Sequence, residues 1–339
     1  MHLHGGHPEF AFERLGVEPR AVLDFSVNIS PLGVPQAVKE IWNGLLQESE
    51  SYPSENGAGV KKFYESRFGL PPECVLPGNG SIDLIYDIPR MLNIKHALIP
   101  QPTFNDYARA CRASGAKVIN GQLNQLEGCD AYFIGNPNNP TGKIIPSEDL
   151  LQLADHFPEI LFFVDEAFIQ FVEDADPFTL LRSDRLRDNI VIFHSLTKIY
   201  ALPGLRIGAA ISTPKTISKL TSKRAPWMAS RIAERVAVAL ANCIDYERDL
   251  VPMIRTERQR MFQTLENHPS FKPVPGAANF LLAQWTGTEN LDDLLRHLLK
   301  QGLYVRDCRN FRGLEENWFR LGIRLPEENK LLIKALASA

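Results

Sequence analysis

Two charged side chains stand where the sequence is otherwise apolar, and they are the first candidates for chemistry. Asp165 ends the apolar run of residues 160–165, and Lys198 lies just beyond the apolar run of residues 189–195. A carboxylate buried at the end of a strand is costly unless a cation or a hydrogen-bond donor pairs with it. A partly buried lysine has a lowered pKa, and its neutral amine can form an imine with a carbonyl compound. The alternative is that Asp165 caps a turn and that Lys198 is a solvated surface residue.

A glycine-rich turn and an arginine are candidates for binding a phosphate group. Residues 77–81 read Pro-Gly-Asn-Gly-Ser and precede an apolar helical stretch. Two glycines before a helix allow backbone N–H groups to approach a phosphate, and the helix N-terminus favours its charge. A plain turn with a serine helix cap explains the same residues. Arg206 stands at the start of the next apolar segment, residues 206–212.

Residues 136–142 follow another apolar run directly and contain two prolines. Proline restricts the residue before it, so this turn can hold an amide in a fixed direction, although it can equally be a plain loop. A phosphate cradle, an amide, a carboxylate, a lysine and an arginine then meet at one edge of a parallel sheet, where open α/β folds bind ligands. Together they suit pyridoxal 5′-phosphate: lysine for the imine, carboxylate for the ring nitrogen, amide for the ring hydroxyl, and arginine with the loop for the phosphate.

Alternating strands and helices are expected to position these residues. The strand candidates are apolar on both sides, which is typical of strands covered by helices on both faces. The alternation predicts an α/β fold with βαβ units around a mostly parallel sheet. The strand candidates are residues 96–100, 131–135, 160–165, 189–195 and 206–212, and helices are expected at 105–113 and 147–156.

The last third of the chain predicts a second, smaller α+β domain. From about residue 230 to 268 the pattern is helical with little to break it, so a long helix joins the two domains. We expect an N-terminal segment (1–52) that packs with the small domain and a partner subunit, a large domain (53–228), and a linking helix with a small domain (229–339). The later strands are predicted at 279–285, 302–307 and 318–325, with helices at 290–300 and 327–338.

Composition excludes several classes of protein. The 339 residues carry 37 Lys plus Arg against 40 Asp plus Glu, a net charge of −3, and no basic block. This argues against a dedicated nucleic-acid or membrane-surface partner. The five cysteines are scattered with no CxxC pair, which favours a reducing compartment and predicts no structural metal. Because no apolar run approaches about 20 residues and the start is unlike a signal peptide, we expect a cytoplasmic protein.

The ordered set of motifs resembles that of the fold-type I pyridoxal phosphate enzymes, in the histidinol-phosphate aminotransferase branch, and within it the threonine-phosphate decarboxylases of cobalamin biosynthesis. The resemblance implies that Lys198 is the Schiff-base lysine and that Asp165 pairs with the pyridine nitrogen. It implies that Asn139 bonds the ring hydroxyl and that Phe104 stacks on the ring. Tyr52 would reach the neighbouring subunit's cofactor in a homodimer. The implied cofactor phosphate ligands are Asn79, Gly80, Ser81, Ser195, Thr197 and Arg206.

Both ends of the chain favour the decarboxylases over the aminotransferases within this resemblance. His4, Gly5 and Gly6, followed by the segment of residues 23–33, look like the decarboxylase start. The resemblance implies that His4 and Asn28 help bind a substrate phosphate. Without it, His4 is more simply interpreted as a disordered terminal residue.

Two arginines near the C-terminus complete the implied substrate site. Arg320 would bind the α-carboxylate and Arg306 the substrate phosphate, because the planar guanidinium binds both groups bidentately. Phe168 stands where many aminotransferases of the superfamily have tyrosine, and the decarboxylases share this phenylalanine. The expected reaction is decarboxylation of L-threonine O-3-phosphate, or of L-serine O-phosphate. The alternative is an aminotransferase acting on histidinol phosphate or an aromatic amino acid.

Overall fold

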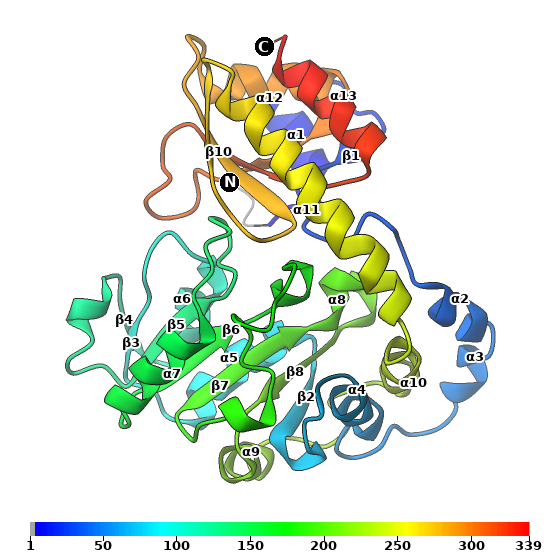
Figure 1. The fold of residues 1–339 in the computed structure, drawn as a ribbon, viewed down its shortest axis with the longest axis vertical. Helices are drawn as coiled ribbons and strands as arrows, with labels where there is room; N and C mark the ends of the chain where they lie inside the picture. The colour runs from blue at the N-terminus through cyan, green and yellow to red at the C-terminus, as the bar shows by residue number, and fades with distance from the viewer. Residues whose placement is uncertain (1–3, 339) are drawn as a thin grey trace.

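The central strands of the chain form one seven-stranded sheet in the computed structural model, which describes residues 4–338 (Figure 1). The sheet order is β2–β8–β7–β6–β5–β3–β4. Strand β8 is antiparallel to both of its neighbours, and all the other pairs are parallel, which confirms the mostly parallel sheet. The strands are β2 (Val75–Asn79), β3 (His96–Leu98), β4 (Lys117–Ile119), β5 (Ala131–Gly135), β6 (Leu161–Asp165), β7 (Ile190–Ser195) and β8 (Ile207–Ile211).

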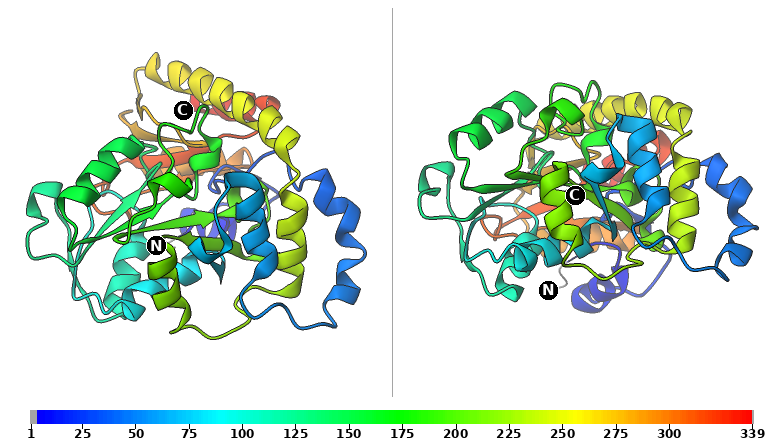
Figure 2. Two further views of the ribbon diagram at one scale, coloured as in Figure 1. Left: turned by 60° about the horizontal axis from the view of Figure 1, so that its bottom comes forward. Right: turned by 90° about the horizontal axis from the view of Figure 1, so that it is seen from below.

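Helices cover both faces of this sheet, which explains why its central strands are apolar on both sides (Figure 2). Successive strand residues point to opposite faces, so Phe133 and Phe163 join one hydrophobic cluster while Ile134 and Val164 join the other. The first face packs against α5 (Ser81–Met91), α6 (Asn105–Ala113) and α9 (Pro214–Thr221). The second packs against α4 (Ala58–Phe68) and α7 (Ser147–His156), with α10 (Arg231–Leu240) lying on α4.

A smaller four-stranded antiparallel sheet, ordered β12–β13–β10–β9, forms the upper part of the molecule in Figure 1. The single strand predicted at 302–307 is wrong, because it is divided between two sheets. Its first half, β11 (Leu303–Tyr304), pairs with β1 (Leu23–Asp24), and its second half is β12 (Arg306–Asp307). The remaining elements are α1 (Pro8–Leu15), β9 (Phe271–Val274), β10 (Phe280–Trp285), α12 (Leu291–Lys300), β13 (Trp318–Gly322) and α13 (Pro326–Leu336).

The helical pattern predicted from about residue 230 to 268, with a long helix joining the two parts, is confirmed except for one short turn. The chain forms α10 and then α11 (Ile244–Glu266), with a turn between them. The break contains neither proline nor glycine, so it has no local signal. It arises from packing, because α10 lies on α4 whereas α11 runs up to the small sheet (Figure 1). Two short helices, α2 (Gln36–Trp42) and α3 (Leu45–Glu48), pack on the outer side of α10.

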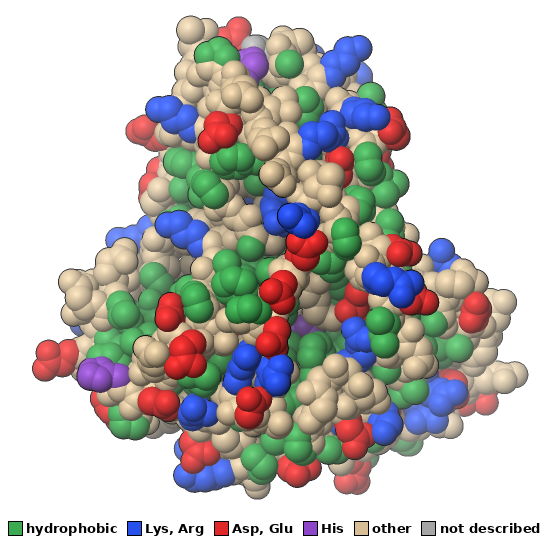
Figure 3. Space-filling view, viewed as in Figure 1, with side chains coloured by type: hydrophobic (Ala, Val, Ile, Leu, Met, Phe, Trp, Pro, Cys, Tyr) green, Lys and Arg blue, Asp and Glu red, His purple; other side chains and the backbone are tan. Residues whose placement is uncertain are grey.

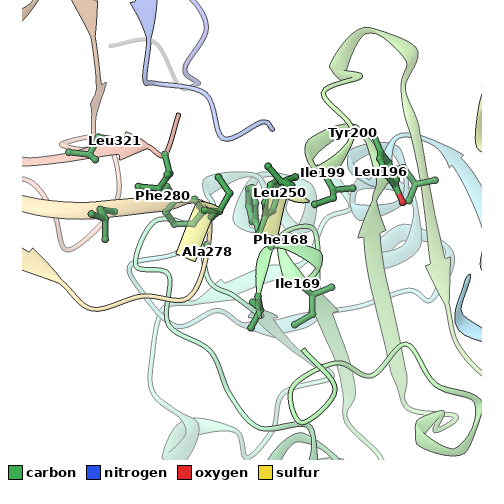
Figure 4. Close-up of a cluster of buried hydrophobic side chains, with 14 of the residues drawn as sticks. Phe168, Ile169, Leu196, Ile199, Tyr200, Leu250, Ala278, Phe280 and Leu321 are labelled. Carbon is green, nitrogen blue, oxygen red and sulfur yellow. The ribbon is translucent and has the colours of Figure 1, made fainter. Parts of the chain in front are cut away.

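One apolar cluster joins the two parts of the molecule, and it includes Leu196 and Ile199, which lie on either side of Lys198 in the sequence (Figure 4). The one-turn helix α8 (Leu196–Ile199) is too short to be stable alone, so packing must hold it in place. Leu196, Ile199 and Tyr200 point into the core on the large-domain side, while Phe280 and Leu321 come from the small sheet. The position of Lys198 is therefore fixed by a core that spans both parts.

The outer surface shows no sign of a specialised charged face in the view of Figure 3, where basic and acidic side chains are interspersed. Within residues 4–338, no helix has both the length and the apolar character that crossing a membrane requires. The same residues contain no cluster of three or more His, Cys, Asp or Glu side chains that could hold a metal ion. The first three residues of the predicted segment 1–52, and Ala339, lie outside the described residues.

Candidate active site

The carboxyl edge of the large sheet brings together the side chains that the sequence singled out. Asp165 ends β6, Ser195 ends β7, and Lys198 lies on α8 directly afterwards. Arg206 precedes β8, and it reaches the same edge only because β8 runs antiparallel to β7. In an all-parallel sheet the start of this strand would lie at the opposite edge.

A cavity of about 530 Å³ opens at this edge and is lined from both parts of the chain. Its lining includes side chains of the N-terminal segment, of the large sheet and of the small sheet. The predicted site residues among them are His4, Gly5, Asn28, Ser81, Phe104, Asn139, Asp165, Ser195, Thr197, Lys198, Arg206 and Arg320. Ten further residues complete the wall, among them Ser26, Tyr86, Asp106, Tyr107 and Phe168.

Asp165 is a buried carboxylate with two hydrogen-bond donors. The Tyr107 hydroxyl donates to Asp165 Oδ2 at 2.7 Å, and the backbone N–H of Ala167 donates to Oδ1 at 3.0 Å. Burial raises the pKa of Asp165, while the two hydrogen bonds and the positive charge of Lys198 oppose that rise. These donors stabilise the charged form, so Asp165 can serve as an anion facing the cavity.

Lys198 has a pKa lowered to about 8. Burial is the main cause, the positive charges of Arg206 and Arg320 add to it, and the negative charge of Asp165 opposes it. Its backbone carbonyl accepts a hydrogen bond of 2.9 Å from the N–H of Ser30, which ties the N-terminal segment to α8. With this pKa a minor but usable part of the Lys198 amine is neutral at neutral pH, and the neutral amine is the nucleophile.

We expect the rate at which the cofactor-free protein captures pyridoxal 5′-phosphate to rise with pH through about 8 and then to level off. The neutral amine of Lys198 is the reactive form, and its pKa lies near that value. Stopped-flow absorbance of the forming imine measures this rate. Arg320→Gln removes one positive charge, so the midpoint should move to higher pH. A midpoint above pH 10 in the wild type would contradict the lowered pKa.

Arg206 approaches the start of α5 at a point where only glycine fits. A Cβ on Gly80 would lie 2.4 Å from Arg206 Nη2, and Gly80 has a φ of +78°. A Cβ on Gly208 would lie 2.4 Å from the backbone nitrogen of Ser81. The two glycines therefore let strand β8 and its arginine close against the α5 N-terminus. Ser195 and Thr197 share a hydroxyl–hydroxyl hydrogen bond of 2.8 Å at the same end of the cavity.

Gly80→Ala should weaken binding of pyridoxal 5′-phosphate by roughly 10- to 100-fold, because the new methyl group displaces the Arg206 guanidinium. Losing one hydrogen bond from a charged group removes about 1.5–3 kcal/mol. Equilibrium titration of the cofactor-free variant measures the dissociation constant. Gly69→Ala is the matched control, since Gly69 also has a positive φ of +62° but a methyl group there would meet no other atom within 4 Å. Equal losses in both variants would show that backbone strain alone is responsible.

Arg320 crosses from the small sheet into the cavity as a buried guanidinium. Its Nη1 donates to Asn139 Oδ1, its Nη2 donates to the carbonyl of Ser26 at 3.0 Å, and it lies over the Phe280 ring. Among residues 4–338 its Nε has no hydrogen-bond partner. Burial lowers the pKa of Arg320 to about 10. The environment of this guanidinium therefore favours an anionic ligand.

The N-terminal segment forms part of the same wall. His4, Gly5 and Asn28 line the cavity, and the N–H of Gly6 donates to Ser26 Oγ at 2.8 Å. A Cβ on Gly5 would lie 2.4 Å from the Ser26 carbonyl, so the close approach of these two strands of chain requires glycine. Asn28 Oδ1 is buried and has no hydrogen-bond partner in the described part of the chain.

Five predicted site residues do not line this cavity. Asn79 is exposed, and its backbone N–H donates to the Asp83 carboxylate. Gly80 lies beside Arg206, and Gly6 donates its N–H to Ser26, so each glycine contacts a residue of the cavity wall. Arg306 lines an adjacent cavity of about 220 Å³, which shares His4 with the larger one, and its Nη2 donates to Asn310. Tyr52 is 83% exposed, with its ring 5.5 Å from that of Trp227.

Sequence reasoning missed Tyr107, which holds Asp165, and Tyr86 and Asp106, which line the cavity. A signal was present for Tyr107, because it follows Phe104 by three residues at the start of a predicted helix and so shares its face. The two rings meet edge to face at 5.4 Å.

The fold and the cavity at its carboxyl edge define a pyridoxal 5′-phosphate-dependent enzyme of fold type I. The chain belongs to the family Aminotransferase class I and II, which it matches over residues 21–336 and whose members use this cofactor.

Two curated relatives point to one branch of this family. The chain is 32% identical to the threonine-phosphate decarboxylase of Salmonella typhimurium, over 98% of this chain and 95% of the relative. It is 30% identical to the adenosylcobalamin biosynthesis bifunctional protein CobDQ of Leptospira interrogans, over 99% of this chain but only 41% of that longer protein. Among solved structures, the histidinol-phosphate aminotransferase of Clostridium acetobutylicum superimposes with a TM-score of 0.85 at 26% identity, covering 94% of this chain and 98% of that one.

Proposed function

We propose that this enzyme decarboxylates L-threonine O-3-phosphate, or L-serine O-phosphate, for the nucleotide loop of cobalamin. The observation that carries the proposal is that His4, Gly5 and Asn28 line the same cavity as Lys198. This segment adds polar groups that suit the phosphate of such a substrate. The likeness to the Salmonella decarboxylase over nearly the full length of both chains also supports it.

The lining residues fit the cofactor that the family uses. The space that the missing side chain of Gly80 leaves beside Arg206, together with Ser81, Ser195 and Thr197, suits a phosphate. At the other end, the Asp165 carboxylate, held by two donors, suits a protonated pyridine nitrogen. When bound, pyridoxal 5′-phosphate supplies an electron sink for the electrons released at the substrate Cα.

Side chains of this protein would orient the substrate and move its protons. Arg320 would bind the α-carboxylate, because it is a buried cation whose Nε has no partner in the described chain. Asn28 and His4, with Arg306 from the adjacent cavity, would hold the phosphate. The bond from Cα to the carboxylate carbon breaks, CO2 leaves, and Lys198 delivers a proton to Cα. The product from threonine phosphate is (R)-1-amino-2-propanol O-2-phosphate.

The direct test incubates the cofactor-loaded protein with L-threonine O-3-phosphate in the absence of any oxo acid. CO2 and the phosphorylated amine are measured together, with L-serine O-phosphate in parallel. Multiple turnovers with equal yields of both products are expected. The competing outcome is no CO2 from either substrate, with turnover only when histidinol phosphate, or an aromatic amino acid, and 2-oxoglutarate are supplied. That result would replace the proposal with transamination at the same cofactor site.

The proposal includes a homodimer in the cytoplasm, with Tyr52 reaching the partner's cofactor and segment 1–52 contacting the partner. In support, several large apolar side chains near Tyr52 and along α2, α3 and α11 are exposed in the single chain. They are Trp42, Leu46, Tyr52, Trp227 and Ile244. Light scattering should give the mass of two chains, and Tyr52→Phe should weaken cofactor binding. A monomer that retains full activity would contradict this part.

A further inference from the structure

Asp106 is a buried carboxylate in the cavity wall whose role the proposed reaction leaves open. Its side chain is 4% exposed, and it lies in the first turn of α6. The Tyr86 hydroxyl and Arg109 Nη1 both donate to Oδ1, at 2.7 and 2.9 Å. Its second oxygen, Oδ2, is buried and makes no hydrogen bond to any described residue. A half-satisfied buried carboxylate is costly, so its place in a binding cavity calls for an explanation.

A group that becomes cationic on protonation faces that second oxygen from the N-terminal segment. Asp106 Oδ2 lies 3.4 Å from His4 Nε2, a distance at which a protonated imidazole forms an ion pair. The His4 ring also lies 6.1 Å from the Phe104 ring, which begins the same helix. Both residues of the pair line the cavity that holds Lys198. Asp106 therefore fixes where the His4 imidazole sits and balances its charge.

The residue before Asp106 contacts Asn310, which in turn accepts a hydrogen bond from the other predicted phosphate ligand, Arg306. Asn105 Nδ2 donates to the backbone carbonyl of Asn310 at 3.2 Å, and Asn310 Oδ1 accepts from Arg306 Nη2 at 2.9 Å. Two adjacent residues at the start of α6 thus contact His4 and Asn310, and Asn310 is the residue that accepts a hydrogen bond from Arg306. The α6 N-terminus belongs to the large domain, while both of these groups come from the chain ends.

We propose that Asp106 is a positioning residue for the phosphate group of the substrate, acting through His4. This inference rests on a phosphorylated substrate, as in the proposed function. The carboxylate orients the His4 imidazole at the cavity wall and pairs with it when the ring carries a proton. A bound phosphate then faces an imidazolium whose far side is already paired, so the cation is oriented before the substrate arrives. Asp106 itself does not touch the phosphate, because two anions in contact repel.

A double-mutant cycle on the cofactor-loaded enzyme, with no N-terminal tag, tests this assignment. Asp106→Asn keeps the shape and the acceptor for Tyr86 but removes the charge. It should raise KM for L-threonine O-3-phosphate and the inhibition constant of inorganic phosphate by roughly tenfold, with kcat changed less than about twofold. His4→Gln should do the same. The double variant should match His4→Gln within about twofold, because Asp106 acts only through His4.

Two further variants separate positioning from simple damage to the helix. Arg109→Gln removes the exposed partner of the same carboxylate and should leave KM unchanged. Asp106→Glu keeps the charge and should hold KM within about threefold of the wild type. If Asp106→Asn does not fold, Asp106→Glu still tests whether the charge of this residue positions His4. The assignment is overturned if the two losses multiply in the double variant, if kcat falls while KM stays constant, or if Asp106→Glu is as impaired as Asp106→Asn.

The phosphate readout also separates this inference from the proposed function. If the wild type proves to be an aminotransferase on histidinol phosphate, the same cycle is measured with that phosphate monoester and with inorganic phosphate. Coupling between Asp106 and His4 in phosphate binding would then stand although the decarboxylase proposal had failed. If the wild type decarboxylates and the inhibition constant of inorganic phosphate is unchanged in all variants, the inference is contradicted while the proposed function stands.

Discussion

Lys198→Ala should lower kcat by about 10⁴- to 10⁶-fold, the largest effect expected of any single substitution in this protein. In the proposed function, Lys198 supplies both the amine that attaches the cofactor and the proton carrier at the reacting carbon. Its pKa near 8 leaves a usable fraction of neutral amine at neutral pH. Steady-state release of CO2 measures the loss. Borohydride reduction followed by peptide mapping should label Lys198 in the wild type and no residue in the variant.

The fold should survive this substitution, which makes the loss interpretable. The apolar cluster that holds α8 includes Leu196, Ile199 and Tyr200 but not the Lys198 side chain (Figure 4). Removing a partly desolvated amine leaves no cavity in that cluster, so the melting temperature without cofactor should change by less than about 5 °C. Residual activity above about one per cent of the wild type would mean that another amine carries the chemistry.

Asp165→Asn should lower kcat by about 10²- to 10⁴-fold. An amide in this position no longer keeps the pyridine nitrogen protonated, and it cannot balance the charge of Lys198. The Ala167 N–H can still donate to the amide oxygen, and the Tyr107 hydroxyl can rotate to accept from the amide NH2 group, so the side chain keeps its shape and place. Single-turnover kinetics measure the loss, and the absorbance of the bound cofactor should change with it.

Glu166→Gln is the matched control, because Glu166 is the neighbouring buried carboxylate on the opposite face of the sheet. It accepts hydrogen bonds from the Thr179 hydroxyl and the Leu180 N–H and does not line the cavity. Activity should remain within about threefold of the wild type. Equal loss of kcat in both variants would show that Asp165 matters for folding rather than for the cofactor.

The stability of the wild type relative to the Glu166→Gln variant should also depend on pH. Burial raises the pKa of Glu166 from 4.5 to about 8 in the folded protein. A folded-state pKa above the unfolded one means that this carboxyl contributes most below pH 4.5, and that stability is lost as the pH rises through 8. Glu166→Gln does not titrate, so it should match the wild type near pH 5 and become the more stable protein near pH 9. Thermal melts across this range measure the difference.

Local sequence accounts for much of the large domain. Buried strands in an α/β sheet are apolar on both faces, so the runs that end at Gly135, Asp165 and Ser195 could be recognised without tertiary information. Parallel strands end at one common edge, which is why Asp165 and Lys198 were predicted to lie together. The cofactor followed from the chemical types of these residues, and the family assignment confirms it.

Local sequence failed where long-range packing decides the direction of the chain. No residue pattern shows that β8 runs antiparallel, yet that orientation alone brings Arg206 to the carboxyl edge. The turn between α10 and α11 has no helix breaker, and it forms because the two helices pack on different parts of the molecule. The segment predicted as one strand at 302–307 divides because its halves pair with partners from opposite ends of the chain, Leu23 and Phe319 among them.

The sequence by itself determined which groups are available for chemistry: a lysine, a carboxylate, an amide, an arginine and a glycine-rich turn in a fixed order. The tertiary structure decided which groups support them. Tyr107 reaches Asp165 across 58 residues, and His4 meets Asp106 from the far end of the chain. Such contacts depend on how separate elements pack, and each element's own pattern encodes only which face it buries. For that reason the sequence could propose the reacting residues, whereas it could not give their hydrogen-bond and ion-pair partners.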